Sequence, residues 1–341
     1  MGCEKMMPGA KWVTMADVAR ASGVSKITVS RVLRTPDKVA PATRERVREA
    51  IRALGYIPDE AAGALAKGKS STVAALLSIL DGSLFAPAID GLTGYLRQND
   101  HELLIASTGY SQQVEAELVP VVMSRHPAGL ILSSTDHTDV VQALIRRSGV
   151  PVVEIWELPE EPLDMAVGFS NFSAGSSMTR LLCDTGHRHI AYIGGGQRIR
   201  GQMRYQGYAH TLKELGLTEP PHIPDDIQDT ARVERGARGI RWFLEHFPEV
   251  DAIFCMNDWI ALGAVSEARR LGKSVPADIA IAGLGDFDFA RDRGIGITTI
   301  RIPGIEMGAT AARLILERNQ GAQNQSTVID LGFDIVRRSS A

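Results

Sequence analysis

Near the N-terminus, residues 13–31 read Val-Thr-Met-Ala-Asp-Val-Ala-Arg-Ala-Ser-Gly-Val-Ser-Lys-Ile-Thr-Val-Ser-Arg. Thr14 is placed to cap a first helix, and Asp17 follows three residues later, which is the spacing of a capping box with Asp in place of Glu or Gln. Gly23 interrupts the helical pattern and supplies a turn. Ser25 is then a suitable cap for another helix. The pattern therefore predicts a helix, a tight turn and a second helix.

The second predicted helix has one apolar and one polar face. Val29 and Val32 recur at the spacing of a buried face. A short helix with outward polar residues at its N-terminal end fits the major groove of double-stranded DNA. We expect Lys26 to donate hydrogen bonds to guanine and Ile27 to contact a thymine methyl group, with Arg31 nearby. Phosphate contacts are expected from Ser25, Thr28 and Ser30.

A third helix is predicted at 41–54, because Pro41 is suited to the first turn of a helix. It would close a small core through Val47, Ala50, Ile51 and Leu54. Its opposite face carries Arg44, Arg46, Arg48 and Arg52. These arginines either contact DNA phosphates or form a solvated helix face, and the pattern favours neither.

Charge is distributed unevenly along the 341 residues. Residues 1–70 hold 13 Lys and Arg against 7 Asp and Glu, whereas the remainder holds 24 against 33. A basic head on an acidic body fits DNA binding at one end of the chain. The length also exceeds what a single core supports, so we expect two or three domains.

The three cysteines, Cys3, Cys183 and Cys255, lie far apart and form no paired-cysteine motif. This pattern fits a reducing compartment and argues against a zinc finger or a disulfide framework. No apolar run reaches membrane-spanning length, and the N-terminus shows no signal-peptide pattern. We therefore expect a cytoplasmic protein with no membrane partner, and we interpret residues 1–12 as a disordered leader.

From residue 72 onward, short apolar stretches alternate with amphipathic ones. This alternation predicts an α/β core with parallel sheets that are buried on both faces. The predicted strands are 73–79, 102–106, 129–132, 152–155, 165–169, 189–193, 252–255 and 279–282. The predicted helices include 86–98, 112–124, 139–148, 173–185 and 259–271.

The chain resembles the LacI/GalR family of bacterial repressors. In the N-terminal part, the resemblance rests on Thr-x-x-Asp-Val-Ala…Gly-Val-Ser-x-x-Thr-Val-Ser-Arg and on Leu-Gly-Tyr-Ile-Pro at 54–58. In the core, it rests on Gly-His-Arg-His-Ile-Ala-Tyr-Ile-Gly at 186–194 and on the phrases at 257–264 and 275–283. The resemblance covers essentially the whole chain after residue 12.

This resemblance implies an α/β fold with an N-terminal all-α helix-turn-helix headpiece. The headpiece would span 13–58, and a hinge helix or linker would span 59–71. The remaining residues, 72–341, would form a two-lobed, periplasmic-binding-protein-like core of doubly wound parallel sheets for effector binding and dimerisation. The chain would cross between the lobes near 168–172, near 296–302 and again near 325.

The hinge is Ala-rich and is interrupted by Gly63 and Gly68. The resemblance implies that it folds into a short helix on the operator and inserts Leu65 into the minor groove, where an apolar wedge bends the duplex. Gly63 disfavours a helix by roughly 1 kcal/mol, so we expect the hinge to depend on DNA and dimer contacts. A plain flexible linker is the alternative. The predicted DNA-binding residues also include Thr14 and Tyr56.

Polar residues follow most of the predicted core strands. Ligands of open α/β sheets bind beyond the carboxyl ends of the strands, so we expect a small-molecule effector there, between the lobes. The resemblance implies that Arg204 contacts a sugar and that Asn257 is a ligand-binding asparagine. It also places Glu154 where some members carry an aspartate, and Asp286 beside a position where Gly285 replaces the family's acid. The predicted effector-binding residues are Phe85, Tyr110, Thr135, His137, Glu154, Asn171, Arg204, Asn257, Asp258 and Asp286.

The identity of the effector is predicted from three short stretches of sequence. Leu-Asp-Met-Ala-Val-Gly-Phe-Ser-Asn-Phe at 163–172, Ser-Ser-Thr-Asp-His-Thr at 133–138 and Gly-Tyr at 109–110 resemble the gluconate-responsive branch of the family. The gluconate carboxylate needs a cation, and Arg204 can supply a bidentate, charge-assisted pair. A phosphorylated or keto sugar acid, or a neutral sugar, is the alternative. No cofactor is expected beyond this effector.

The combined interpretation is a repressor that binds a pseudo-palindromic operator as a homodimer. Effector binding would change its affinity for the operator, in a direction that the residues leave open. The C-terminal residues 337–341 show no leucine heptad of the kind that forms tetramers, so we expect a dimer.

Other classes of protein fit the residues less well. Gly194-Gly-Gly follows a predicted strand, but it lacks the dinucleotide-binding pattern of a dehydrogenase. His187 and His189 share one side of a strand without further metal ligands, and no Gly-x-Ser-x-Gly elbow indicates a hydrolase. A transport-type binding protein would lack the basic head. We therefore expect that the protein is not an enzyme.

Overall fold

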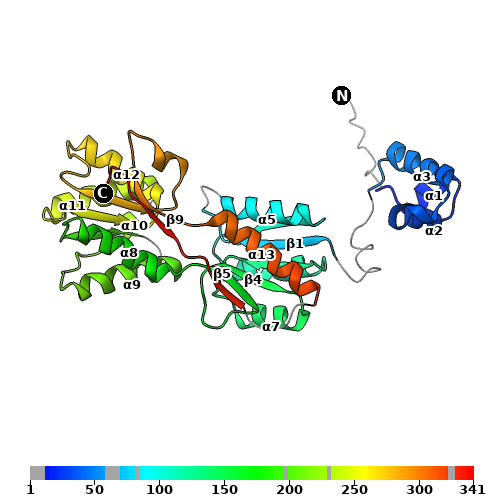
Figure 1. Ribbon diagram of the computed structural model, residues 1–341, viewed down its shortest axis with the longest axis horizontal. Helices are drawn as coiled ribbons and strands as arrows, with labels where there is room; N and C mark the ends of the chain where they lie inside the picture. Colours follow the sequence, from blue (N-terminus) through cyan, green and yellow to red (C-terminus); the bar gives the residue numbers. More distant parts are fainter. Residues whose placement is uncertain (1–11, 58–69, 81–83, 195–198, 229–231, 322–326) are drawn as a thin grey trace, which may run out of the picture. The chain divides into compact units, whose positions relative to one another are not determined.

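The chain divides into two units, residues 1–70 and 71–341, which are described separately (Figure 1). The computed structural model describes residues 12–57, 70–80, 84–194, 199–228, 232–321 and 327–341. The expected leader and most of the expected hinge, including Leu65, lie outside these residues. Within the described ranges, no helix is both long enough and apolar enough to cross a membrane.

The first unit is a three-helix headpiece. The Asp17 carboxylate accepts hydrogen bonds from the backbone nitrogen and the hydroxyl of Thr14, at 3.0 and 2.7 Å. Gly23 adopts a left-handed φ of 66°, and Ser25 Oγ caps the second helix. The predicted helix-turn-helix is therefore confirmed. The elements are α1 (Met15–Ser22), α2 (Lys26–Arg34), the 3-10 helix η1 (Pro36–Lys38) and α3 (Pro41–Leu54).

A small apolar core holds the three helices together. It consists of Val18, Ala19, Val29, Val32, Val47, Ala50 and Tyr56. The prediction that Leu54 closes this core was wrong, because that residue is 37% exposed. Helix α3 ends at Leu54, and Gly55 then turns the chain with a φ of 63°, which brings Tyr56 into the core instead.

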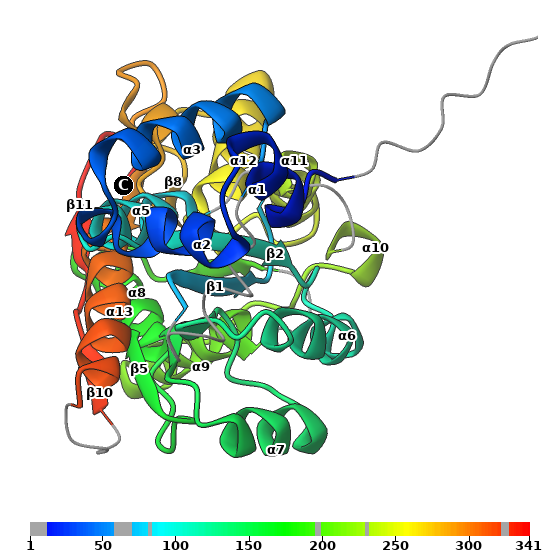
Figure 2. The ribbon, with the colours of Figure 1, turned by 90° about the vertical axis from the view of Figure 1, so that its right-hand side faces the viewer.

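The first sheet of the second unit is fully parallel, in the order β10-β5-β4-β3-β1-β2. Its strands are β1 (Thr72–Leu77), β2 (Glu102–Ser107), β3 (Gly129–Leu132), β4 (Val152–Trp156), β5 (Met165–Gly168) and β10 (Thr327–Asp330). One face packs against α5 (Ala86–Gln98) and α13 (Gly304–Asn319), and the other against α6 (Gln112–Met123) and α7 (Asp139–Ser148). Figure 2 shows these helices beside the sheet. We call this sheet and its helices the first lobe.

The second sheet has the order β11-β9-β8-β7-β6, and β11 is antiparallel to β9 while the other pairs are parallel. Its strands are β6 (Ile190–Ile193), β7 (Ala252–Cys255), β8 (Ala280–Leu284), β9 (Thr298–Arg301) and β11 (Asp334–Val336). One face packs against α8 (Asn171–Asp184) and α9 (Ile199–Glu214), and the other against α11 (Arg232–His246) and α12 (Asp258–Arg270). Two short elements, α10 (Asp225–Gln228) and η2 (Asp288–Arg291), complete this second lobe.

Three connections join the lobes. The chain leaves the first sheet after β5 for α8, returns after β9 to α13, and leaves again after β10 for β11. The last crossing lies at residues 331–333, later than the position near 325 that the resemblance implied. The reason is that the chain first forms β10 alongside β5.

The eight predicted strands all overlap observed ones, and so do the five predicted helices. The predicted α/β class with two mostly parallel sheets is confirmed. The predicted strands did not include β9, β10 and β11. β10 alternates half-buried and exposed residues, and β11 has no buried residue, so neither carries the continuous apolar pattern of a central strand.

Candidate nucleic-acid interface and effector site

The first turn of α2 presents side chains to solvent. Lys26 and Arg31 are exposed, and Ile27 is 66% exposed although it is apolar. Thr28 and Ser30 are half-buried beside them. A lysine and an accessible isoleucine at a helix N-terminus can reach guanine acceptors and a thymine methyl group. These exposed positions agree with the predicted DNA-binding face of α2. The contacts of this face with DNA bases stay predictions.

Two other predicted DNA-binding residues have partners within the headpiece. The Thr14 hydroxyl donates to Asp17 as part of the helix cap. Tyr56 is 8% exposed, because Gly55 turns it into the apolar core. We therefore assign the Tyr56 ring to the packing of the headpiece, in contrast to the predicted DNA contact.

The arginines of α3 differ in their surroundings. Arg44 and Arg52 form ion pairs with acids of the headpiece, at 3.7 and 2.8 Å. Arg46 and Arg48 are exposed and form no ion pair with a described residue. These two are the α3 arginines that remain open for contact with phosphate.

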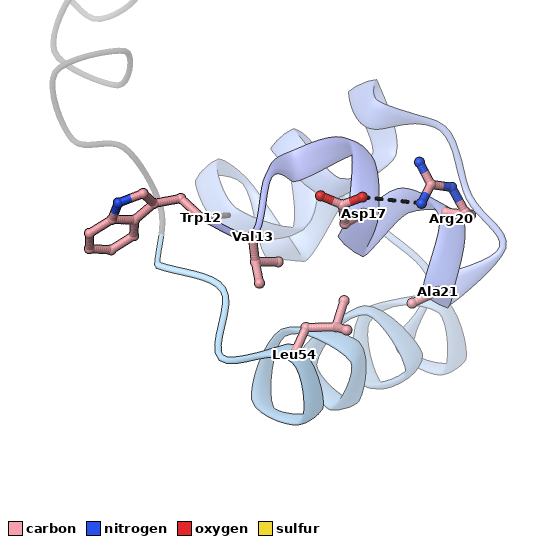
Figure 3. A pocket seen from close by; sticks show the side chains of 6 residues that line it. All are labelled: Trp12, Val13, Asp17, Arg20, Ala21 and Leu54. Atoms are coloured by element: carbon pink, nitrogen blue, oxygen red, sulfur yellow. Dashed lines mark hydrogen bonds and ion pairs between the residues drawn. The ribbon is translucent and has the colours of Figure 1, made fainter. Parts of the chain in front are cut away.

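A pocket on the headpiece lies between α1 and the end of α3 (Figure 3). It has a volume of about 430 Å³ and is lined by Trp12, Val13, Asp17, Arg20, Ala21 and Leu54. Its charged groups, Asp17 and Arg20, pair with each other at 3.1 Å. Ligand sites combine an apolar lining with convergent polar groups that contact the ligand. Since the charged groups here are already paired and none of the lining residues belongs to α2, we assign no ligand to this pocket.

In the core, Arg200 of α9 reaches across to the first lobe. Its Nη2 donates to the Ser78 hydroxyl at 3.3 Å and to the Ser133 carbonyl oxygen. Its Nε lies 3.5 Å from Glu157 Oε1. Ser78, Ser133 and Glu157 follow β1, β3 and β4. They therefore lie at the carboxyl ends of parallel strands, where ligands bind in open α/β sheets.

Two aromatic rings face the Arg200 guanidinium. Its Cζ lies 5.2 Å from the ring centroid of Phe85 and 5.9 Å from that of Tyr110, within cation–π range. Phe85 is buried and packs against Trp156 with a centroid distance of 4.7 Å. Trp156 and Tyr110 have φ values of 87° and 64°. Such left-handed backbone is strained for non-glycine residues and clusters at functional sites.

A buried network joins Glu157 to Arg204. Asn171 Nδ2 donates to Glu157 Oε1 at 2.9 Å, and Arg204 Nη1 donates to Asn171 Oδ1 at 2.5 Å. Burial raises the pKa of Glu157 to about 6, although Arg200 and Arg204 act to lower it. Arg204 Nε and the nearby Tyr192 hydroxyl form no hydrogen bond of normal geometry with a described residue. Unsatisfied buried donors of this kind are rare, and a ligand or a water molecule commonly satisfies them.

His137 and Glu154 form a separate buried cluster with Glu115 of α6. His137 Nδ1 lies 2.6 Å from Glu115 Oε1, and its Nε2 lies 3.4 Å from Glu154 Oε1. Burial lowers the pKa of His137, but both carboxylates outweigh this effect and raise the pKa to about 9. Glu154 also accepts a hydrogen bond from the Leu163 backbone at 2.7 Å. We therefore assign His137 and Glu154 to the packing of the first lobe, in contrast to the predicted effector contact.

Asn257 and Asp258 lie at the start of α12 but differ in accessibility. Asn257 is half-buried, and its Oδ1 caps the helix by accepting from the Ile260 backbone at 3.0 Å. Asp258 is fully buried and accepts from the Thr299 hydroxyl at 2.6 Å and from the Phe287 backbone at 3.1 Å. Burial raises the pKa of Asp258 to about 6. Asp258 thus ties α12 to β9, whereas the Asn257 amide nitrogen bonds no described residue.

Asp286 is surrounded by arginines of its own lobe. Its carboxylate lies 2.7 Å from Arg301 Nε and 3.2 Å from Arg291 Nη2, and it also pairs with Arg338. Although burial raises the pKa of Asp286, the hydrogen bonds from Arg301 and Arg338 bring it below its usual value. The side chain is almost fully buried by these partners. We therefore assign Asp286 to the packing of the second lobe rather than to the predicted effector contact.

The predicted effector residues are thus divided. Arg200 and Glu157 are surrounded by four of them, Phe85, Tyr110, Asn171 and Arg204. The other predicted residues lie outside this group. Thr135 is half-buried and bonds no described residue. Sequence reasoning missed Ser78, Ser133, Glu157 and Arg200. Arg200 lies four residues before Arg204 on α9, so both share one helix face. That spacing is the signal that would have identified Arg200.

The described residues contain no group of three or more His, Cys, Asp and Glu side chains that could hold a metal ion. They do combine a helix-turn-helix headpiece with a two-lobed α/β core that has a polar site at the strand ends. This combination defines a class of protein, the ligand-responsive transcriptional regulators.

Comparison with known proteins identifies the family. Residues 14–59 match the bacterial regulatory proteins of the lacI family, and residues 179–341 match a periplasmic binding protein-like domain. The chain is 34% identical to the HTH-type transcriptional regulator GntR of Escherichia coli K12, over 94% of this chain and 96% of GntR. It is 32% identical to the regulator IdnR of the same organism, over 95% of this chain and 97% of IdnR.

A solved structure supports the same relationship. The crystal structure of a LacI-family transcriptional regulator from Silicibacter pomeroyi has a TM-score of 0.88 and 28% identity, covering 96% of this chain and 99% of that one. The chain therefore belongs to the LacI family of transcriptional repressors. Members of this family regulate transcription and are not enzymes.

Proposed function

We propose that this repressor responds to a sugar acid, with gluconate as the first candidate, bound between the two lobes of the core. The observation that carries the proposal is a network at the ends of the strands, in which Arg200 pairs with Glu157 and Arg204 is linked to the same carboxylate through Asn171. Arg200 and Arg204 bring two positive charges to this network, which favours an anionic ligand. The resemblance of residues 163–172 to the gluconate-responsive branch supports the same class of effector.

The proposal includes a homodimer on a pseudo-palindromic operator, with no cofactor besides the effector. In such a dimer, two copies of α2 would enter successive major grooves of the operator. The effector would change operator affinity if it binds one arrangement of the lobes more tightly than the other. We propose a cytoplasmic location, because a repressor must reach its operator DNA.

The test is calorimetric titration of the full chain with gluconate, 6-phosphogluconate, 2-ketogluconate and glucose, repeated with Arg204→Ala. Binding of one acid that the variant loses supports the proposal. Binding of glucose alone would contradict a sugar-acid effector and leave the repressor assignment intact. Gel retardation of operator DNA with and without the bound acid then gives the sign of its effect.

A further inference from the structure

We infer that Arg200 selects an acidic effector, by acting as the counter-ion of the effector carboxylate at the junction of the two lobes. This inference rests on the proposed function and names the group that recognises the acid. It differs from the sequence-based prediction, which gave the carboxylate contact to Arg204.

The position of Arg200 places a cation from one lobe at the ligand edge of the other. Helix α9, which carries it, packs with α8 against the second sheet, whereas its partners Ser78, Ser133 and Glu157 belong to the first lobe. Its Nη2 donates there to two neutral oxygens, the Ser78 hydroxyl and the Ser133 carbonyl. A carboxylate forms stronger, paired hydrogen bonds with a guanidinium than neutral oxygens do. An acid that enters at this edge therefore competes effectively for Arg200.

Arg204 is less suited to hold the effector carboxylate. It is 6% exposed, and its Nη1 is engaged by Asn171 at 2.5 Å. An effector carboxylate could use Nη1 only if the hydrogen bond to Asn171 were released. We therefore treat Arg204 as a positioning residue. It holds Asn171, which in turn orients Glu157 toward Arg200.

The charges around Arg200 also favour an acid. Glu157 lies within ion-pair distance of Arg200, and the contact at 3.5 Å involves Nε rather than either Nη atom. Arg204 brings a second cation to the same network. A neutral sugar that displaced Ser78 or Ser133 would leave the buried side of Arg200 with weaker compensation, which is unfavourable. A carboxylate would supply the compensating charge.

The rings of Phe85 and Tyr110 hold the Arg200 guanidinium in place before a ligand binds. Both rings face it at cation–π distances, and Phe85 is itself held by Trp156. A side chain that is already fixed loses less conformational entropy when a ligand binds. A lysine at this position would keep the charge but would lack the planar fork that pairs with a carboxylate.

The experiment compares gluconate with sorbitol, which has the same hydroxyl chain but a CH2OH group in place of the carboxylate. Both are titrated calorimetrically into the full chain and into Arg200→Gln, Arg200→Lys, Arg204→Gln and Lys213→Gln. Lys213 is exposed on the same helix and serves as the matched control for loss of a positive charge. Melting curves show that each variant is folded, and weak sorbitol binding is measured by its competition with gluconate.

We expect the unaltered chain to prefer gluconate over sorbitol at least tenfold. Arg200→Gln should weaken gluconate binding at least tenfold and leave sorbitol binding within twofold, so that the preference disappears. Arg200→Lys should retain part of the preference. Arg204→Gln should weaken both ligands alike, and Lys213→Gln should change neither.

An Arg200→Gln variant that keeps the original preference would overturn the inference and leave the proposed function standing. Equal loss of both ligands in that variant would overturn it as well, because it would show a structural role. If the unaltered chain binds no sugar acid, the proposed function fails and the inference falls with it.

Discussion

Gly175 of α8 lies against the carbonyl oxygen of Arg204 in α9, and a Cβ atom on Gly175 would stand 2.0 Å from that oxygen. The contact is reciprocal, because a Cβ atom on Gly207 would stand 2.0 Å from the carbonyl oxygen of Phe172. Only glycine permits so close an approach of the two backbones. Since Asn171 and Arg204 lie on these two helices, the glycines set the spacing of the hydrogen bond between them.

We expect Gly175→Ala to push α8 and α9 apart. Overpacking of this kind destabilises a protein by about 1–3 kcal/mol, and the displaced Arg204 should weaken effector binding. Urea unfolding and calorimetric titration measure the two effects. The matched control is Gly94→Ala, because Gly94 is an exposed helical residue whose Cβ would meet nothing within 4 Å. This control should be neutral, or stabilising by up to about 1 kcal/mol. A Gly175→Ala variant as stable as the control would refute the account.

The His137 cluster predicts a loss of stability at alkaline pH. The pKa of His137 is about 9 in the folded chain, above its ordinary value of 6.5. Folding therefore favours the protonated form, so its stabilisation is complete below pH 6.5 and is lost as the pH rises through 9. The free energy of unfolding should fall by up to roughly 3 kcal/mol across this window. Urea unfolding at stepped pH values measures it.

His137→Gln is the matching variant, because glutamine keeps the size and the polarity but cannot take a proton. It should be less stable than the unaltered chain at pH 6.5, and the difference should shrink toward pH 9. Parallel stability curves for the two chains would show that His137 does not carry the effect.

The raised pKa of Glu157 predicts that its charged side chain destabilises the folded chain at neutral pH. Its pKa of about 6 lies above the ordinary 4.5, so stability falls as the pH rises through this interval and its proton is lost. At neutral pH the charged side chain should cost about 2 kcal/mol relative to a neutral one. Glu157→Gln keeps an acceptor for Asn171 and should therefore be more stable at pH 7.5, with the gain vanishing below pH 4.5. Denaturant unfolding at both pH values is the measurement, and no gain at pH 7.5 would contradict the prediction.

Lys26→Ala is expected to change the sequence preference of the headpiece. Loss of one good base contact costs about 1–3 kcal/mol and relaxes selection at one base pair. Binding to a library of operator sites measures this preference. Arg48→Ala serves for comparison, because a phosphate contact would weaken all sites alike and reduce the salt dependence. An unchanged preference in Lys26→Ala would remove that residue from base reading.

Much of the fold could be predicted because its signals are local. The cap formed by Thr14 and Asp17 and the turn at Gly23 act within a few residues of chain, so the helix-turn-helix followed from spacing alone. The central strands are short apolar runs between amphipathic helices, which indicates a parallel sheet covered on both sides. β10 and β11 lacked such a pattern, because their pairing with β5 and β9 is decided by contacts distant in sequence.

The sequence did not show which charged residues form the effector site. Asp286, Glu154 and Arg200 are all charged residues in or near loops that follow strands, and their residue types do not distinguish them. Only the packed structure turns Asp286 toward three arginines and Glu154 toward His137, while it carries Arg200 across to the first lobe. The linear chain thus specified the elements and their order, since hydrogen bonds within helices and apolar periodicity are short-range. Which charges face the ligand was left to tertiary packing, because a charge takes its partner from the segments that the fold brings beside it.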